Sequence, residues 1–442
     1  MTDHEFIGKF WIDTDSVGLQ RPGVLRVGNG STPVLLVDGA LTSLMQAVGT
    51  SGAGDTLVTR YEPVSDFTPR TIHGITADGT KITLLHAQTR RYFGGLLPDE
   101  QSEELQAIRV LIGEHVRNRD HPFSGIRVAL QSAHAMLSPL WPNRTPLEDG
   151  GTVHLEEDAG TVWLVLQDFA PQSLSVLDRR YLRPLCTLLS LGIGDAVGLL
   201  AVQVREDSAS PWWPIHSKAH EPYDLPIRHG TLLRKGDISA TVVATWLGKA
   251  ETLGPLPPVV ARGTRGSTVL ETQVLELTTV AEGLHRRLRP DALRFSDDIG
   301  RAVRDAAAAA AEEIRVGSGE AVKGFLAYVQ EIGYGQRLLD LAEMTRPVIP
   351  EVTGRTSRWK TAVYNARNDF AHRARPDWFD DSDYDQYVTV ALSVQWLLRT
   401  ILLIEAGIPA SLLHARFQEH EEYQLFLEQA KVWQPRIYGT NN

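Results

Sequence analysis

The sequence predicts an α+β protein. An N-terminal antiparallel β-rich, sandwich-like domain with inserted helices precedes an all-α helical bundle. Up to about residue 250 apolar and polar residues mostly alternate, as in strands, whereas beyond residue 268 apolar residues recur at helical spacing. Between the two parts, residues 251–268 concentrate Pro and Gly without a period, which is typical of a linker. The predicted domains are therefore residues 1–250 and residues 269–442.

Three β-hairpins are predicted in the N-terminal part. In each, two alternating runs flank a short turn that contains Gly, and Asp-Gly and Asn-Gly are the dipeptides that most favour such turns. The hairpins are residues 23–39 around Asn29-Gly30, residues 73–87 around Asp78-Gly79 and residues 152–169 around Ala159-Gly160. Hairpins of this kind imply an antiparallel sheet.

Other segments interrupt the predicted strands. Residues 98–116 have an acidic first turn and apolar residues at helical spacing, and residues 179–204 are rich in apolar residues, so the first segment is predicted as a helix and the second as a buried helix. Residues 210–226 are rich in Pro, His and Trp and are predicted as a loop. Its Trp212-Trp213 pair could stack on a ligand, but aromatic anchors that pin the loop to the sheet are the favoured interpretation.

The C-terminal part is predicted as an all-helical bundle. Its predicted helices cover residues 269–288, 298–319, 319–345 as one or two helices, 356–374, 387–408, and a last helix from Pro409. The segment 387–408 is long and apolar, but Gln395, Arg399 and Glu405 interrupt it. It is therefore predicted as a buried core helix and not as a membrane span.

Composition excludes several classes of protein. The single cysteine, Cys186, rules out a disulfide framework and a zinc site built from cysteines. A net charge of −10 argues against the broad basic surface that binds duplex nucleic acid, but it leaves room for a local basic site. The N-terminus lacks a basic segment followed by an apolar run, so we expect a cytoplasmic protein. No cofactor and no metal ion are predicted.

The segment "NARNDFAHR", residues 365–373, is the strongest candidate for chemistry. On a helix, Tyr364, Asn368 and His372 are four residues apart and share one stripe. Arg367 lies about 140° around the axis from His372, but its long side chain can bend towards that stripe. The product is a cluster of imidazole, amide and positive charge, which suits phosphodiester chemistry.

The residues alone leave a second interpretation open. Arg367, Asp369 and Arg373 could form ordinary surface ion pairs while His372 caps or packs. An Arg followed by a His at similar spacing also occurs at Arg109–His115 and at Arg127–His134, so spacing by itself is not specific.

A family resemblance favours the first interpretation. Residues 367–373, "RNDFAHR", resemble the Arg-x4-6-His signature of HEPN ribonucleases, in which Asn commonly follows the Arg. Residues 275–288, "LELTTVAEGLHRRL", resemble the first helix of ApeA-type HEPN domains, and Glu282 matches the acidic position there. Residues 6–26 are similar to the start of the ApeA N-terminal β-rich domain, although a single Trp11 stands where a Trp pair is expected.

The resemblance implies a metal-independent endoribonuclease of an anti-phage abortive-infection system. In this family the 2′-hydroxyl attacks the adjacent phosphorus and leaves 2′,3′-cyclic phosphate and 5′-hydroxyl ends. His372 would act as general base or acid, and Arg367 would bind the non-bridging oxygens. Glu282 would orient Arg367 or His372 across the bundle; the alternative interpretation is an exposed carboxylate paired along its own helix. The implied catalytic residues are Arg367, Asn368, His372 and Glu282, and the implied substrate-binding residues are Arg373 and Tyr364.

The implied partners are RNA, a second copy of the chain bound through the HEPN domain as a homodimer or higher oligomer, and a phage-derived trigger at the N-terminal domain. No membrane association is implied. The rival hypothesis is a non-catalytic helical dimerisation or interaction protein with a ligand-binding β-domain. A hydrolase built from His and Asp of the N-terminal half has no nucleophile elbow or spaced ligand set to support it.

Overall fold

The computed structural model describes residues 4–13, 19–28, 30–41, 45–53, 56–63, 68–94, 101–131, 136–137, 141, 144–218, 230–262, 269–372 and 381–439. Contacts divide the chain into two compact units, and each is described by itself. Unit 1 comprises Met1–Cys186, Val197–Pro226 and Ile238–Leu247. Unit 2 comprises Thr187–Ala196, Ile227–Asp237 and Gly248–Asn442.

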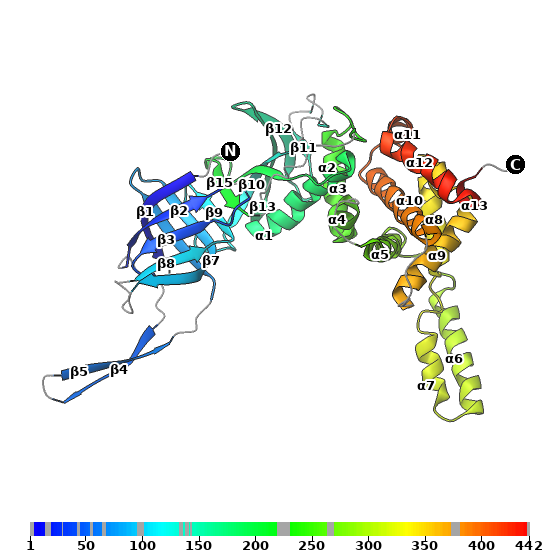
Figure 1. The fold of residues 1–442 in the computed structure, drawn as a ribbon, viewed down its shortest axis with the longest axis horizontal. Helices are drawn as coiled ribbons and strands as arrows, with labels where there is room; N and C mark the ends of the chain where they lie inside the picture. The colour runs from blue at the N-terminus through cyan, green and yellow to red at the C-terminus, as the bar shows by residue number, and fades with distance from the viewer. Residues whose placement is uncertain are drawn as a thin grey trace. The chain divides into compact units, whose positions relative to one another are not determined.

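Unit 1 holds the strands (Figure 1). They are β1 (His4–Ile12), β2 (Arg21–Val27), β3 (Val34–Asp38), β4 (Met45–Ala53), β5 (Thr56–Pro63), β6 (Arg70–Thr76), β7 (Lys81–Gly94), β8 (Gln101–Gln106), β9 (Arg109–Ile112), β10 (Pro122–Leu130), β11 (Thr145–Pro146), β12 (Thr152–Asp158), β13 (Thr161–Ser173), β14 (Leu199–Arg205) and β15 (Trp213–Ser217). Apart from the β4–β5 hairpin, the described strands form one sheet in the order β11-β12-β13-β10-β14-β15-β9-β7-β6-β1-β2-β3-β8.

Part of this sheet closes on itself. The long strand β7 pairs with β6 and β9 along its first half and with β8 along its second half. The strands β7-β6-β1-β2-β3-β8 therefore form a ring, and its apolar core includes Phe10, Leu25, Leu35, Ile72 and Leu84. The sandwich-like expectation is refined accordingly: an antiparallel β-rich unit is present, but a closed ring buries its apolar residues.

The three predicted hairpins are confirmed. Strands β2 and β3, β6 and β7, and β12 and β13 pair antiparallel. Gly79 has φ 84° and Gly160 has φ 77°, a backbone conformation that favours Gly. Asn29 of the first hairpin lies outside the described residues.

The helix predicted over residues 98–116 is wrong, because this segment forms β8 and β9. Glu103 and Glu104 are paired within the sheet and do not lie on a solvated helix face. Glu103 is buried, and the backbone N–H of Leu41 donates to its carboxylate at 2.8 Å. Glu104 is also buried and accepts from Arg91 at 2.7 Å. Tertiary partners thus override the helical spacing.

The helix predicted over residues 179–204 is only half right. A short helix α1 (Leu174–Leu177), a π-helical turn η3 (Asp178–Leu182) and α2 (Arg183–Ile193) are followed by β14. The strand belongs to an apolar segment buried in the sheet, where strand and helix cannot be distinguished by hydrophobicity alone.

The loop predicted over residues 210–226 contains β15, and residues 219–226 lie outside the described residues. Trp213 is buried and packs edge-to-face on Phe123. The guanidinium of Arg205 lies 4.4 Å from the ring of Trp212 and that of Arg127 lies 5.2 Å from it. These contacts agree with aromatic anchors that fix the segment to the sheet.

Unit 2 is helical. Its helices are the C-terminal parts of α2 and α3 (Ala240–Leu253), then α4 (Leu256–Ala261), α5 (Leu270–Leu288), α6 (Asp297–Ile314), α7 (Ser318–Phe325), α8 (Tyr334–Thr345), η5 (Pro350–Thr353), α9 (Thr356–His372), α10 (Asp381–Glu405), α11 (Ala410–Gln418), α12 (Glu421–Trp433) and α13 (Pro435–Tyr438). The predicted bundle is therefore confirmed, although the helix that begins after Pro409 is followed by α12 and α13.

The predicted linker, residues 251–268, differs from the structure. Residues 251–253 complete α3, residues 256–261 form α4, and residues 263–268 lie outside the described residues. Pro257 and Pro258 lie in the first turn of α4, where a helix does not need their missing N–H groups.

Helix α10 is the central helix of the bundle and packs against α5, α8, α9 and α12. By length and composition alone Asp383–Glu405 could cross a membrane, but 78% of its most apolar window is buried inside the structure, as expected for a core helix. Arg399 is buried, and burial lowers its pKa to about 10. Its Nε donates to the carbonyl of Leu191, near the C-terminal end of α2, at 2.6 Å, and this hydrogen bond stabilises the buried guanidinium.

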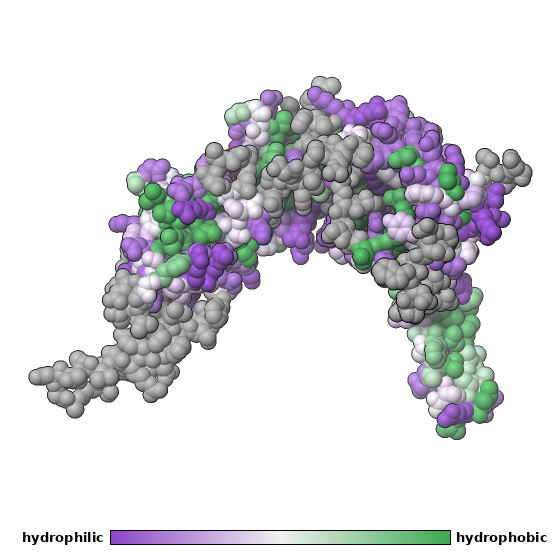
Figure 2. Space-filling view, viewed as in Figure 1, coloured by the Kyte–Doolittle hydropathy of each residue, from purple (hydrophilic) through white to green (hydrophobic). Residues whose placement is uncertain are grey.

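Helices α6 and α7 pack on each other as a hairpin. Ala308 and Gly300 of α6 are buried, whereas Ile299, Val303 and Ile314 are exposed along one stripe. Figure 2 shows the resulting apolar surface over this hairpin. At its base, Leu293 faces Glu331 in an antiparallel bridge.

Candidate active site

Helix α9 carries the predicted motif. Trp359, Val363 and Ala366 are buried at helical spacing, and the indole N–H of Trp359 donates to Ser393 Oγ at 2.9 Å. This buried face fixes the rotation of α9 about its axis. Arg367 and Asn368 consequently lie at the border of the buried face, where both are partly buried.

Arg367 is held by a carboxylate and an aromatic ring. Its Nη2 lies 2.7 Å from Glu282 Oε2 of α5 in an ion pair, and the two side chains are 29% and 22% exposed. Its guanidinium carbon lies 4.3 Å from the ring centroid of Tyr334, the first residue of α8. Three helices thus position one cation, and this pair is more enclosed than an ordinary surface ion pair.

Tyr334 is fixed in turn. Its hydroxyl donates to the carbonyl of Thr278 at 3.3 Å, and burial raises the pKa of this hydroxyl, so the ring stays neutral. The ring of Tyr364 lies 6.3 Å from that of Tyr334, and Tyr364 is 45% exposed. The partly exposed ring of Tyr364 therefore lies beside the aromatic ring that Arg367 contacts.

Glu282 is shared between two arginines. Its Oε1 accepts from Arg286 Nη2 at 3.2 Å, one turn along α5. Arg286 also pairs with Glu331 at 2.5 Å, and Glu331 accepts from Arg337 of α8 at 2.9 Å. Positive and negative side chains thus alternate from Arg367 to Arg337.

A buried imidazole continues this network. Nη1 of Arg337 donates to His285 Nδ1 at 3.2 Å, and His285 Nε2 lies 3.0 Å from Asp340 Oδ2. Because an arginine can only donate, Nδ1 must accept, so the proton of the neutral ring is on Nε2 and points to Asp340. Burial lowers the pKa of His285, which favours this neutral form.

The remaining predicted residues are placed less completely. His372 is the last residue of α9, its side chain lies outside the description, and Arg373 lies outside the described residues. Asp369 accepts from the hydroxyl of Tyr387 on α10 at 3.2 Å and so attaches the C-terminal part of α9 to the core helix. The structure brings together Arg367 and Glu282, and it leaves the position of the imidazole of His372 open.

Comparison with protein families identifies this bundle. Residues 275–412, from α5 into α11, match the family model described as Apea-like HEPN. The C-terminal bundle is an ApeA-like HEPN domain. The β-rich architecture of the N-terminal unit is consistent with the ApeA arrangement. No curated protein and no solved structure matches the chain.

The match to the Apea-like HEPN model supports, at a coarse level, a nuclease-type function in defence. Both Glu282 and Arg367 lie within the matched region. Sequence reasoning missed Arg286, Glu331 and Tyr334. The four-residue step from Glu282 to Arg286 is a signal that could have found the first of these, whereas Glu331 and Tyr334 reach the site only through helix packing.

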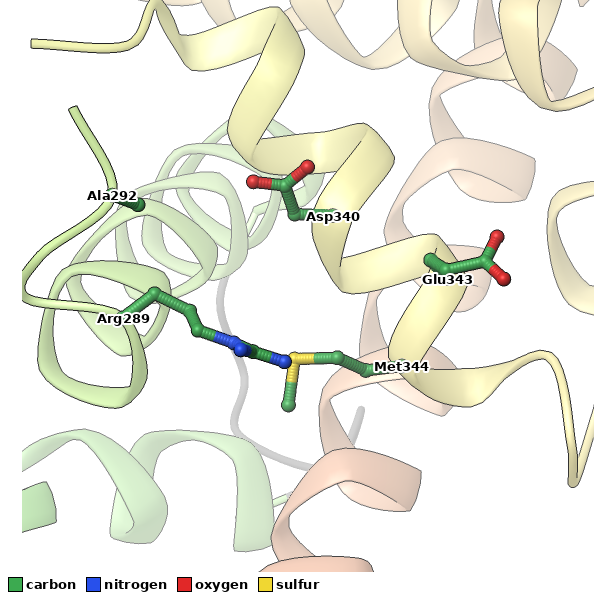
Figure 3. Close-up of a pocket in the computed structure, with 5 residues that line it drawn as sticks. All are labelled: Arg289, Ala292, Asp340, Glu343 and Met344. Carbon is green, nitrogen blue, oxygen red and sulfur yellow. The ribbon is translucent and has the colours of Figure 1, made fainter. Parts of the chain in front are cut away.

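A pocket of about 420 Å³ lies at the far end of the network in the HEPN domain. Arg289, Ala292, Asp340, Glu343 and Met344 line it. Figure 3 shows Arg289 extending from the end of α5 towards α8, from which Asp340, Glu343 and Met344 project. Among the described residues, no group of three or more His, Cys, Asp or Glu side chains is placed to share a metal ion.

Proposed function

We propose that the protein is a metal-independent endoribonuclease of an anti-phage abortive-infection system. The observation that carries the proposal is the Arg367–Glu282 pair, because it holds a guanidinium at the edge of α9, five residues before His372, within the HEPN match. An oriented cation of this kind suits the charge that develops on phosphorus oxygens during cleavage.

In the proposed reaction the ribose 2′-oxygen bonds to the adjacent phosphorus while the bond from phosphorus to the 5′-oxygen breaks. The general base takes the 2′-hydroxyl proton, and the general acid gives a proton to the leaving 5′-oxygen. The products carry 2′,3′-cyclic phosphate and 5′-hydroxyl ends. His372 is assigned to a proton transfer, since imidazole titrates near neutral pH.

Arg367 is assigned to the non-bridging oxygens of the phosphate. Asn368, partly buried beside it, would hydrogen-bond the phosphate or hold the imidazole. Arg373 and the exposed ring of Tyr364 are assigned to substrate binding. One imidazole cannot serve both proton transfers at once, so we further propose that a second copy of the HEPN domain supplies a second motif in a homodimer.

The β-rich unit is proposed to restrain the nuclease until it receives a phage-derived trigger. The support is the ApeA-like architecture together with the need to keep a nuclease silent in its own host. In cells, the wild type should reduce phage yield and His372→Ala should not. Equal protection by the two would contradict the role of the nuclease in defence.

The decisive experiment is incubation of the wild type and His372→Ala with total RNA in EDTA. We expect fragments with 2′,3′-cyclic phosphate ends from the wild type, and a loss of about 100-fold or more in the variant. Equal activity of both proteins, or strict metal dependence, would contradict the proposal. Equal inactivity of both, together with stable dimers, would favour the non-catalytic interaction protein.

A further inference from the structure

Arg286 bridges two carboxylates beside the candidate site. It lies on α5, one turn after Glu282, and its side chain is 46% exposed. Its Nη2 donates to Glu282 Oε1 at 3.2 Å, and its Nη1 pairs with Glu331 Oε2 at 2.5 Å. A long and partly exposed side chain is therefore held at both ends of its guanidinium.

Glu331, which pairs with Arg286, has further contacts of its own. The backbone of Glu331 faces Leu293 in an antiparallel bridge, and its carboxylate also accepts from Arg337 at 2.9 Å. The Arg337 side chain is only 4% exposed and contacts the buried ring of His285. Glu331 is thus held by its backbone bridge and by Arg337 as well as by Arg286.

The two carboxylate oxygens of Glu282 contact different arginines. Oε1 accepts a hydrogen bond from Arg286, and Oε2 forms the ion pair with Arg367. A carboxylate with one arginine neighbour tends to form two parallel hydrogen bonds with it, as a fork-to-fork pair. With Arg286 in place, Glu282 offers Arg367 a single oxygen, and the other N–H groups of Arg367 stay free of Glu282.

We propose that Arg286 is a positioning residue for Arg367. By occupying one oxygen of Glu282, it orients Arg367 through a single contact and keeps the remaining donors available to a phosphodiester anion. This inference rests on the proposed nuclease function, since that function gives Arg367 its anion. Without Arg286, Glu282 is free to take Arg367 in two hydrogen bonds and to draw it from the substrate, and the local positive charge also falls.

The test is a double-mutant cycle with Arg286→Gln, Arg367→Gln and the double variant in the full chain. Two quantities are measured: kcat and KM for RNA cleavage, and the Kd of a 2′-O-methyl oligoribonucleotide, which cannot be cleaved. Arg286→Gln should lower kcat on the order of tenfold in the wild-type background and change nothing in the Arg367→Gln background. Arg286→Lys, which keeps the charge, should recover part of the loss.

Arg287→Gln is the matched control. Arg287 is the next residue of α5, is exposed, and donates to the carbonyl of Thr252 at 3.0 Å, away from Glu282. It should retain wild-type kcat. The proposal is overturned if Arg286→Gln stays within about twofold of the wild type, or if its loss persists in the Arg367→Gln background, as a merely structural role would require.

The binding measurement separates the two hypotheses. If the wild type fails to cleave RNA, the nuclease proposal fails, and the positioning role is judged by Kd alone. Weaker binding by Arg286→Gln that disappears in the Arg367→Gln background would still support it. An unchanged Kd for Arg286→Gln in that case would overturn it.

Discussion

Arg367 is the residue on which the candidate site depends most. A guanidinium can pair with Glu282, lie over the face of Tyr334 and still present further N–H groups, because its donors are spread over a planar fork. A lysine ammonium has one compact charge and cannot keep all these contacts at once. The aromatic face attracts the guanidinium without occupying its N–H donors, whereas a second carboxylate would accept hydrogen bonds from them.

Arg367→Lys should therefore lose activity although it keeps the charge. We expect kcat to fall by roughly 100-fold, as for the loss of one oriented donor to a transition-state anion. RNA cleavage kinetics measure this, and thermal unfolding should change little. The matched control is Arg346→Lys, because Arg346 forms an exposed pair with Glu343 on α8, with side chains 66% and 63% exposed. Wild-type activity of Arg367→Lys would contradict the requirement for a planar fork.

The sequence predicted part of this site. Glu282 was expected to orient Arg367 or His372, and in the structure it contacts Arg367. The catalytic roles of these residues stay predictions. The helical stripe of Tyr364, Asn368 and His372 follows from spacing alone. Tyr334 lies 33 residues before Arg367 in the chain, so only the packing of α8 on α9 brings it near.

Among the helices, the contact between α5 and α8 includes a titratable group, the imidazole of His285. His285 accepts from Arg337 through Nδ1 and donates to Asp340 through Nε2, which requires a neutral ring. Its pKa is lowered, chiefly by burial, whereas in the unfolded chain it is about 6.5. As the pH falls, the unfolded state binds the proton first, so this contribution to stability is complete above about pH 6.5 and is lost below it.

Replacing His285 tests this seam. Glutamine can accept from Arg337 and donate to Asp340 without titrating, so His285→Gln should weaken the pH dependence of the free energy of unfolding between about pH 7.5 and 5. His285→Ala should instead cost about 1–3 kcal/mol at neutral pH, since it leaves Nη1 of buried Arg337 without the acceptor that His285 provides. Denaturant unfolding at several pH values measures both. An unchanged slope in His285→Gln would show that the ring does not titrate on unfolding.

Local patterns predicted some elements better than others. The hairpins around Gly79 and Gly160 were found because a turn with positive φ is a local property. Strand β8 was missed because Glu103 and Glu104 look like a helix start in the sequence. Their true partners, Leu41 and Arg91, lie elsewhere in the chain, and only tertiary structure makes buried carboxylates acceptable there.

For the whole molecule, the boundary between the two units is also hard to predict from the sequence. Unit 2 is assembled from three separate stretches, and the unit boundaries fall within α2 and within α3. A boundary inside a helix leaves no change of composition to detect. The Pro- and Gly-rich stretch at 251–268 is therefore a poor marker of the division, because much of it is helical.

The proposed homodimer makes a prediction for the intact chain. Light scattering at micromolar concentration should give a dimer or a higher oligomer, and cleavage per chain should rise with protein concentration until dimers form. The reason is that two copies of His372 are needed for the two proton transfers. A strict monomer that still cleaves RNA would contradict this arrangement.

The α6–α7 hairpin leaves and rejoins the domain at a single point. Leu293 and Glu331 face each other there, and the N–H of Arg294 donates to the carbonyl of Gln330 at 2.7 Å. A protein engineer can therefore exchange residues 295–329 for a short turn or a foreign insert without lengthening the connection. The hairpin is therefore a site where a segment can be inserted or removed, and its two ends meet at Glu331, the residue whose carboxylate pairs with Arg286.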